Sequence, residues 1–291
     1  LRAVNSFITV APYENQKKDF GTYECKVLFL VNTCSSWLSP VNPDILKNNM
    51  STKAKDSSLQ KGGGNMMDKV RNAGILGTGR YVPEKVVTND DLSAMMDTND
   101  EWIVTRTGIR TRHIAASGEA EAGRRALGKA GISADQISFM MVATGTPDYP
   151  IPSTASIVQE KLDLSHTGAM DISSGCAGMI HGLITAGGMV SSGMADYVLV
   201  ISSEMLSRHL DWTDRSICIL FGDGASAAVV GPVPEGEGIL SFDMGTDGRF
   251  WNSIHIPAGG VVQPVSEEAI RNKDIYMKME GKKFSPGMYA G

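Results

Sequence analysis

The stretch TGAMDISSGCAGMIHGLITAGGMVSSGMADYVLVISSE, residues 167–204, decides the fold class. Residues 167–173 predict a short strand and residues 176–193 a helix closed by Gly193, because glycine readily adopts the left-handed conformation that ends helices. Residues 197–204 predict a buried strand, since a short continuous apolar run is typical of a strand covered on both faces. Continuous apolar strands separated by helices indicate a layered α/β fold with helices on both faces of the sheet.

The same alternation of strands and helices extends on both sides of this stretch. Before it, we predict a strand ending in a glycine turn over 70–83 and a short helix over 89–96 with Asn89 or Asp90 as its N-cap. A buried strand over 136–146 and a helix over 152–162 starting at Pro152 or Ser153 follow. After it, we predict two β runs around a Gly-Asp-Gly turn over 216–231 and a strand over 238–248.

Bulk composition narrows the function classes. The 291 residues suffice for one large or two ordinary domains, and 42% hydrophobic with 20% charged residues is typical of a soluble globular protein. The net charge of -5 gives no electrostatic reason to expect nucleic acid or an anionic membrane as a partner. No run approaches the roughly 20 apolar residues that span a bilayer. The 4 cysteines form no Cys-x-x-Cys pair and lie in no histidine cluster, so we expect no metal site, no disulfide framework and a reducing cytoplasm.

Residues 1–65 differ in composition from the rest of the chain. They mix isolated aromatics with polar clusters and show no sustained strand or helix period, which is typical of a segment that cannot bury enough apolar surface to fold alone. Codons for residues 61–63 can read as a purine-rich ribosome-binding sequence ahead of Met66. We therefore expect residues 1–65 to be a non-native leader, with a genuine disordered extension as the alternative.

Cys176 is the candidate nucleophile. A free thiol has a pKa of about 8.5, so only about 3% is thiolate at pH 7. At a helix N-terminus, unpaired amides and the helix dipole would stabilise the thiolate, and the same amides would bind an oxyanion. The small residues on both sides leave room for an acyl group. The competing interpretation of this stretch alone is a small buried cysteine at a crowded strand–helix junction.

Other candidate residues give weaker signals. His181 lies roughly 140° around a helix from Cys176, so we expect it to be structural rather than the base of the thiol. Cys218 lies in a predicted apolar strand and is expected to be a core thiol. The Gly-Asp-Gly sequence at 222–224 could bind a phosphate, but a structural turn is the favoured interpretation.

The segment DEWIVTRTGIRTRHIA, residues 100–115, combines Trp102 with Arg106, Arg110 and Arg112. An indole and guanidinium planes can stack an adenine, and the positive charges suit phosphates. From these residues alone, a solvated basic strip is an equal alternative.

Five stretches, taken in order, resemble the β-ketoacyl-acyl-carrier-protein synthase III family, the thiolase-fold condensing enzymes that start type II fatty acid synthesis. They are DTNDEWIVTRTGIRTRHIA, VATGTPDYPIPSTASIVQ, DISSGCAGMIHGL, DWTDRSICILFGDGASAAVV and IYMKMEGKKF. The resemblance implies a thiolase-like layered αβαβα fold, with the N-terminal half complete or nearly so and the C-terminal half largely missing. Residues 66–284 would form this part, and residues 285–291 would be an out-of-frame tail.

The resemblance also implies roles for individual residues. Cys176 would accept acetyl or another short acyl group from acyl-CoA, and malonyl-acyl-carrier protein would then be decarboxylated and condensed with it to a β-ketoacyl thioester. Trp102 and Arg106 match the family's CoA-contacting Trp and Arg, and Arg215 would flank the adenine with Trp102. Ile151 falls where a residue of the partner subunit lines the acyl pocket. The implied partners are acyl-CoA, acyl carrier protein and a second copy of the chain, with no cofactor, metal, nucleic acid or membrane.

Three departures from the family pattern affect the expected activity. The family's His and Asn lie in motifs resembling HQAN and GNTS, and neither motif occurs in the sequence. Without these donors to the thioester oxygen, decarboxylation would lose orders of magnitude in rate, so we expect no condensation. The end KFSPGMYAG departs from the family's strand, which a frameshift near Lys282 would explain. Residues 113–132 are shorter than the family pattern by about one and a half helical turns.

Three alternative functions stay open. A related condensing enzyme of secondary metabolism would share these motifs and differ in its acyl preference. A non-catalytic fragment, such as a pseudogene product, would transfer no acyl group to Cys176. A thiol hydrolase that pairs Cys176 with His181 is opposed by the helical geometry.

Overall fold

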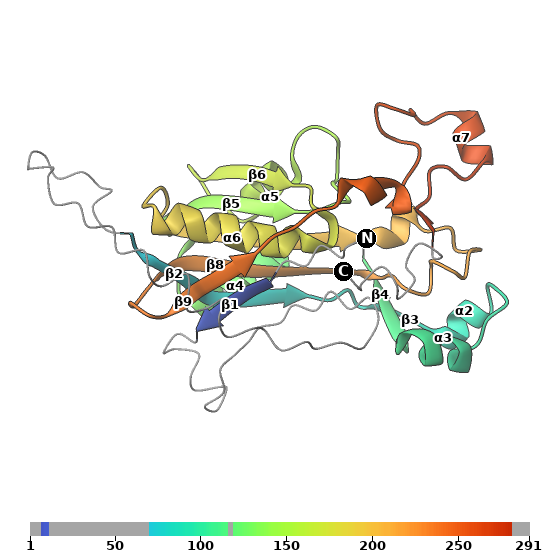
Figure 1. Ribbon diagram of the computed structural model, residues 1–291, viewed down its shortest axis with the longest axis horizontal. Helices are drawn as coiled ribbons and strands as arrows, with labels where there is room; N and C mark the ends of the chain where they lie inside the picture. The colour runs from blue at the N-terminus through green and yellow to red at the C-terminus, as the bar shows by residue number, and fades with distance from the viewer. Residues whose placement is uncertain (1–6, 12–69, 116–118, 281–291) are drawn as a thin grey trace, which may run out of the picture.

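The computed structural model describes residues 7–11, 70–115 and 119–280 (Figure 1). Its central feature is a 5-stranded mixed sheet in the order β2–β8–β7–β5–β6. The strands are β2 (Asn72–Tyr81), β5 (Ile137–Ala143), β6 (Gly168–Ile172), β7 (Tyr197–Met205) and β8 (Asp223–Val233). β5, β6 and β7 are parallel, and β8 is antiparallel to β7 and β2.

Helices cover both faces of this sheet, as the sequence predicts (Figure 1). α4 (Glu119–Ala130) and α5 (Thr154–Lys161) contribute to the core on one face, and α6 (Gly178–Ser191) contributes to the core on the other. None of the helices in the described part of the chain is both long enough and apolar enough to span a bilayer.

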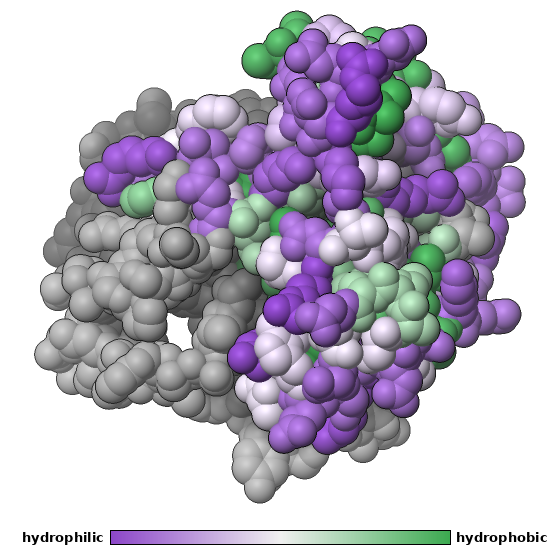
Figure 2. All heavy atoms as spheres, turned by 90° about the vertical axis from the view of Figure 1, so that its right-hand side faces the viewer, coloured by the Kyte–Doolittle hydropathy of each residue, from purple (hydrophilic) through white to green (hydrophobic). Residues whose placement is uncertain are grey.

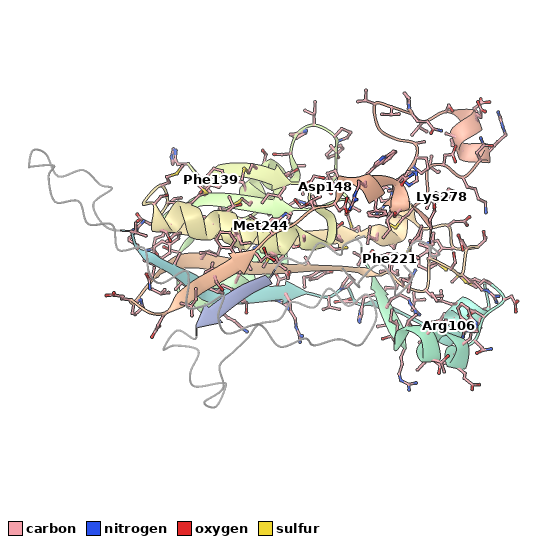
Figure 3. All side chains as sticks on the ribbon, viewed as in Figure 1. Arg106, Phe139, Asp148, Phe221, Met244 and Lys278 are labelled. Carbon is pink, nitrogen blue, oxygen red and sulfur yellow. The ribbon has the colours of Figure 1, made fainter. Side chains whose placement is uncertain are left out.

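A smaller layer lies beyond one end of the sheet. β3 (Lys85–Thr88) pairs antiparallel with β4 (Thr111–Ile114), and α2 (Asn89–Ser93) and α3 (Asp100–Thr107) lie between them in the chain. The surface at this end is mostly hydrophilic, with apolar side chains scattered among the polar ones (Figure 2). Arg106 belongs to this layer and projects from α3 (Figure 3).

The remaining elements follow β8 or precede β2. They are β1 (Phe7–Ala11), β9 (Gly238–Asp243), β10 (Ile254–His255), α7 (Glu267–Arg271) and β11 (Lys278–Met279). β1 pairs antiparallel with β9, a pairing that the composition of residues 1–65 did not predict. The rest of the expected leader and the expected out-of-frame tail, residues 285–291, lie outside the described residues.

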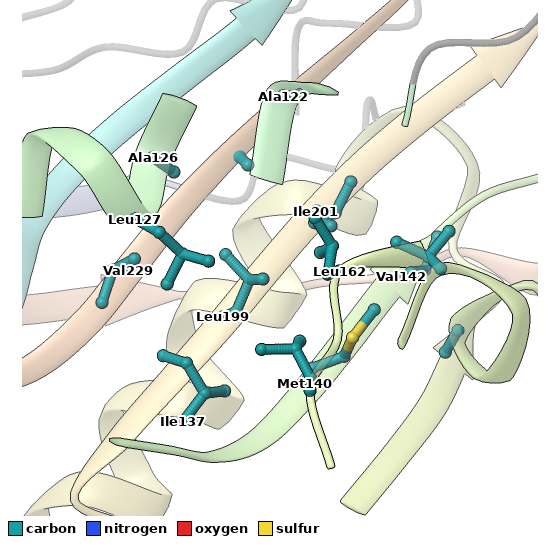
Figure 4. Close-up of a cluster of buried hydrophobic side chains, with 14 of the residues drawn as sticks. Ala122, Ala126, Leu127, Ile137, Met140, Val142, Leu162, Leu199, Ile201 and Val229 are labelled. Carbon is teal, nitrogen blue, oxygen red and sulfur yellow. The ribbon is translucent and has the colours of Figure 1, made fainter. Parts of the chain in front are cut away.

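The residues of β7 alternate between two cores, as the two-residue period of a strand requires. Leu199 and Ile201 face the core beneath α4 and α5 (Figure 4), whereas Val198 and Val200 face the core beneath α6. All four side chains are fully buried. The prediction of a buried strand over 197–204 is therefore confirmed.

β2 and α4 meet backbone to backbone. A Cβ at Gly79 would lie 2.1 Å from the carbonyl oxygen of Ala122, and a Cβ at Gly77 would lie 2.4 Å from the amide nitrogen of Ala130. The predicted glycine turn at the end of this strand is wrong, because both glycines lie inside β2. Their lack of side chains is what lets α4, a helix of 12 residues in the segment expected to be shortened, approach the sheet.

Side-chain caps fix the starts of two helices. α5 begins at Thr154, one residue after the later of the two predicted starts, and Ser153 is its cap, with a hydroxyl that accepts the amide of Ser156 at 3.3 Å. Thr88, rather than Asn89 or Asp90, caps α2. Its hydroxyl accepts the amide of Asp91 at 3.1 Å, and the Asp91 carboxylate accepts the amide of Thr88 at 2.8 Å. This reciprocal capping box places the helix start one residue earlier than the sequence predicts.

The prediction of two β runs over 216–231 is half wrong, because only the second run is a strand, β8. The first run folds into turns in which the amides of Ile217 and Cys218 donate to the carbonyl oxygen of Asp214 at 3.2 and 3.1 Å. The Asp214 carboxylate also accepts the amide and the hydroxyl of Ser216 at 2.9 and 2.6 Å. These local bonds outweigh the β propensity of the apolar residues. Cys218 is nevertheless fully buried, which confirms the predicted core thiol.

The Gly-Asp-Gly segment has a structural role. Asp223 is buried at the start of β8, and its carboxylate accepts the amides of Ala115 and Ser207 at 2.7 and 2.9 Å and the Ser207 hydroxyl at 2.6 Å. This carboxylate therefore joins β8 to the segments that follow β4 and β7, which is a structural role.

Candidate functional site

The carboxyl ends of β5, β6 and β7 meet at one edge of the sheet. Ala143, the last residue of β5, is in register with Ile172 on β6 and Ser202 on β7. The segments that follow these positions carry polar and reactive side chains, including Cys176 after β6 and Glu204 at the end of β7. Ligands of α/β proteins bind at this edge, outside the carboxyl ends of parallel strands.

Cys176 lies in a single 3₁₀ turn, Gly175–Ala177, directly before α6. Its side chain is exposed, so the alternative of a small buried cysteine is wrong. Gly178 packs closely on the end of β5, since a Cβ there would lie 2.8 Å from the Cβ of Ala143. The predicted helix over 176–193 therefore begins two residues late, after the turn that presents the thiol.

The electrostatic surroundings of Cys176 differ from the prediction. Desolvation by the surrounding chain and the negative charge of Glu204 raise the pKa of the thiol, and a hydrogen bond from its own backbone amide lowers it less. The expected stabilisation of the thiolate at the start of α6 is thus outweighed. One side of the side chain reaches solvent, but the resting thiol keeps its proton at neutral pH.

Glu204 is a site residue that sequence reasoning missed. Its half-buried carboxylate accepts the amide of Gly145 at 2.9 Å and the hydroxyl of Thr146 at 3.2 Å. Burial raises the pKa of Glu204, and these two hydrogen bonds oppose that shift. The signal in the sequence was an acidic residue at the end of an otherwise apolar strand, YVLVISSE.

Trp102, Arg106 and Arg215 come together, as the resemblance implies. The guanidinium carbon of Arg106 lies 4.3 Å from the centroid of the Trp102 ring, and that of Arg215 lies 5.0 Å from it. Arg106 follows Trp102 by one turn of α3, whereas Arg215 comes from the segment before β8. Arg215 also donates to the backbone carbonyl of Asp97 and forms an ion pair with its carboxylate at 3.3 Å.

The stack on Trp102 is occupied by this chain's own side chains. An aromatic base between two planes needs about 7 Å, twice a van der Waals separation of about 3.5 Å. Since Arg215 lies 5.0 Å from the ring centroid, a base that stacks between Trp102 and Arg215 has to displace the guanidinium. A planar, anionic ligand can therefore stack between Trp102 and Arg215 only if it replaces the Arg215 guanidinium on the ring.

The other arginines of residues 100–115 have separate structural environments. Arg112 is buried and donates to the side-chain oxygen of Asn89 at 2.9 Å and to the carbonyl oxygen of Ile219 at 3.2 Å. Arg110 is exposed and lies 3.7 Å from the Asp100 carboxylate. The interpretation of these arginines as one solvated basic strip is wrong for Arg112, which is a structural residue.

Ile151 and His181 lie at the margins of the site. Ile151 is 87% exposed in the segment between β5 and α5, so it lines no pocket of its own chain there. His181 is half-buried on α6, beyond the turn that carries Cys176. Within residues 7–11, 70–115 and 119–280, no three His, Cys, Asp or Glu side chains gather as they would around a metal ion.

Comparison with known proteins supports the resemblance. The family model of 3-oxoacyl-[acyl-carrier-protein] synthase III matches residues 170–248. The β-ketoacyl-[acyl-carrier-protein] synthase III of Caldanaerobacter subterraneus is 48% identical over 223 residues, 75% of this chain and 67% of the relative.

Two solved structures share the fold. The 3-oxoacyl-[acyl-carrier-protein] synthase III of Aquifex aeolicus matches with a TM-score of 0.65 and 38% identity over 72% of this chain and 65% of its own. The priming β-ketosynthase of the R1128 polyketide pathway matches with a TM-score of 0.67 and 34% identity over 74% and 65%. The chain thus spans about two thirds of the length of these relatives.

Proposed function

The chain belongs to the β-ketoacyl-acyl-carrier-protein synthase III family, and we propose that it transfers a short acyl group from acyl-CoA to the thiol of Cys176. This transfer is the first half of the condensing reaction that initiates fatty acid synthesis. The observation that carries the proposal is the exposed thiol at the carboxyl ends of β5, β6 and β7, in the turn that opens α6.

The transfer balances without a cofactor. The sulfur of Cys176 attacks the thioester carbonyl carbon of the acyl-CoA, and a new carbon–sulfur bond forms. The bond from the carbonyl carbon to the CoA sulfur breaks, and CoA leaves as its thiol with the proton that Cys176 gives up. The amides at the start of α6 lie next to Cys176 in the chain and suit the developing oxyanion.

The experiment that tests this function is transfer of labelled acetyl from acetyl-CoA to the full chain. We expect one acetyl group per chain, on the peptide that contains Cys176, as measured by mass spectrometry. An intact chain that stays unlabelled, or a label found only elsewhere, would refute the proposal and favour a non-catalytic fragment.

We further propose that the 291-residue chain stops at the acylated cysteine. The His and Asn motifs that the resemblance assigns to condensation are absent from its sequence, and donors of that kind are worth orders of magnitude in rate. With acetyl-CoA and malonyl-acyl-carrier protein together, we expect acetyl-Cys176 and no β-ketoacyl product by chromatography of the carrier protein. Turnover to that product would contradict this part of the proposal.

The Trp102 cluster is proposed as the CoA site, because an adenine can take the place of Arg215 on the indole and the arginines suit the phosphates. We expect Trp102→Ala to raise the acetyl-CoA concentration for half-maximal labelling about tenfold or more, since stacking of a base is worth about 1–3 kcal/mol. Trp251→Ala, at a 72% exposed indole outside the cluster, is the matched control and is expected to change nothing. Equal effects of both substitutions would argue against a CoA site at Trp102.

The similarity to the priming β-ketosynthase supports a second candidate, priming of a polyketide pathway. Acyl carrier protein as second substrate and a homodimer are proposed in either case, with Ile151 reaching the acyl pocket of the partner subunit; its 87% exposure agrees with such a contact. Competition between acetyl-CoA and longer acyl-CoA thioesters for Cys176 separates the two candidates. Preference for acetyl supports fatty acid synthesis, and preference for a longer chain supports polyketide priming.

A further inference from the structure

We propose that Glu204 is a positioning residue for Cys176, which ties the loop after β5 to the end of β7 and places a negative charge at the edge of the sheet that carries the thiol. The functional meaning of this inference rests on the proposed role of Cys176 as the acyl acceptor. Three observations carry it: a hydrogen-bond network, the meeting of strand ends and the distribution of charge.

The hydrogen-bond network fixes the carboxylate in place. Its two oxygens accept from different donors, the amide of Gly145 at 2.9 Å and the hydroxyl of Thr146 at 3.2 Å. The Thr146 oxygen also accepts the amide of Met205 at 2.9 Å, so the hydroxyl proton is directed at Glu204. The Thr146 amide in turn donates to the Thr144 hydroxyl at 3.0 Å. The loop after β5 and the end of β7 are thus held by a closed set of bonds around one negative charge.

The strand ends bring this network to the thiol. Ile172 on β6, Ala143 on β5 and Ser202 on β7 stand in one row of the sheet. Glu204 follows this row on β7, and Cys176 follows it in the turn after β6. The close contact of Gly178 with Ala143 holds that turn against the end of β5. The network and the nucleophile therefore share one edge of the sheet.

Three other titratable groups lie on the elements around this edge, and one of them, Asp171, has hydrogen-bond partners of its own. The Asp171 carboxylate on β6 accepts the amides of Thr154 and Ala155 at 2.8 and 2.7 Å, at the start of α5. Asp148 lies in the loop after β5 (Figure 3), and His181 lies on α6. Among the titratable groups that the structure describes, Glu204 is the one whose charge raises the pKa of the Cys176 thiol. The two hydrogen bonds to Glu204 favour its charged form against the burial that raises its own pKa.

The chemical consequence is a thiol that reacts slowly when no substrate is bound. A protonated thiol reacts poorly with oxidants and alkylating reagents, because the thiolate is the reactive form. In acyl transfer the proton leaves Cys176 only as the bond to the acyl carbon forms, and the departing CoA sulfur takes it up. The structure therefore assigns Glu204 the task of restricting the thiol to reactions in which a proton acceptor is supplied by the substrate.

The test is the pH dependence of alkylation of Cys176 by iodoacetamide, counted on the peptide that contains this residue. Glu204→Gln removes the charge and keeps an oxygen that accepts the Gly145 amide. We expect the midpoint of the pH profile to fall by about one pH unit, because a like charge is removed from beside the thiolate. Below the midpoint the rate rises about threefold, since about tenfold more thiolate is offset by about threefold lower nucleophilicity.

The matched control is Asp135→Asn, which removes one exposed negative charge before the opposite end of β5 and is expected to leave the midpoint in place. A midpoint that is unmoved or higher in Glu204→Gln overturns the proposal, as does an equal shift in both variants. Should Glu204→Gln not fold, Glu204→Asp decides, because it keeps the charge and draws it back by one methylene: a lower midpoint supports the proposal, and an unmoved or higher midpoint overturns it.

Alkylation requires no acyl transfer, so the two proposals fail separately. A shifted profile in a chain that takes no acetyl group would refute the proposed function and leave the role of Glu204 intact. A normal acetyl transfer with an unshifted profile would refute the role of Glu204 alone.

Discussion

Replacing Cys176 with alanine abolishes transfer of acetyl from acetyl-CoA to the chain. We expect at least about a thousandfold lower labelling, because removing the nucleophile of a covalent mechanism removes its intermediate. Ser173 and Ser174 lie three and two residues before it in the chain, but their hydroxyls are far weaker nucleophiles than a thiol at neutral pH. Time courses of label incorporation in parent and variant, at matched protein concentration, measure the difference.

Cys218→Ala is the matched control for this substitution. Cys218 is fully buried, and burial raises the pKa of its thiol to about 11, with the charge of Asp214 adding to the shift. Such a thiol is neither accessible nor ionised, so its removal should leave acetyl labelling unchanged. Label that persists in Cys176→Ala, or that disappears in Cys218→Ala, would assign the acyl acceptor to another residue.

Gly79→Ala is expected to destabilise the chain by about 3 kcal/mol or more, at the upper end of overpacking effects. The added Cβ would lie 2.1 Å from the Ala122 carbonyl oxygen and 2.6 Å from the Ala126 amide nitrogen. Both atoms belong to the backbone of α4, so no side chain can turn aside to relieve the clash, and the helix has to move off the sheet. The midpoint of urea unfolding measures the loss.

Gly128→Ala is the paired control, since this glycine lies on α4 with open space around the position of its Cβ. Alanine is favoured over glycine inside a helix by about 1 kcal/mol, so this variant should be as stable as the parent or more so. Equal unfolding midpoints for Gly79→Ala and the parent would contradict the backbone contact between α4 and β2.

Much of the fold can be predicted from the sequence where local and tertiary signals agree. β7 is an uninterrupted apolar run, and burial on both faces is what such a run requires. The start of α5 follows Ser153, whose hydroxyl caps the helix, and the Asp171 carboxylate on β6 accepts the next two amides, those of Thr154 and Ala155. In such cases the neighbouring residues are enough to predict the element.

The failures occur where a residue's role depends on distant parts of the chain. Gly77 and Gly79 were predicted to form a turn because what requires glycine at these positions, the close approach of α4, lies outside the strand. The run SICILF looked like a strand because the carboxylate of Asp214, which turns it, precedes the apolar pattern. Neither hydrophobic periodicity nor secondary-structure propensity could predict these two contacts.

The candidate site shows the same division. Cys176 stands out from its own neighbours, small residues at a strand–helix junction, and the structure presents it as exposed. Trp102 and Arg215 are far apart in sequence, and only the family resemblance placed them together. The predicted direction of the Cys176 pKa shift was wrong because burial by the surrounding chain, and then the charge of Glu204 on another strand, raise the pKa, and the local helix argument omits both.

At the proposed CoA site, the contact of Arg215 with Trp102 would make the affinity for a ligand the difference between two contacts on the indole, that of the ligand and that of the guanidinium. The ligand's contact with the indole has to be stronger than the contacts that Arg215 makes with the indole and with Asp97. A ligand without a planar base would therefore bind weakly there. Arg215 can return to the Trp102 ring when the ligand leaves, and this contact would favour the release of free CoA after acyl transfer. Selectivity and release would then both depend on a side chain that competes with the ligand for its place.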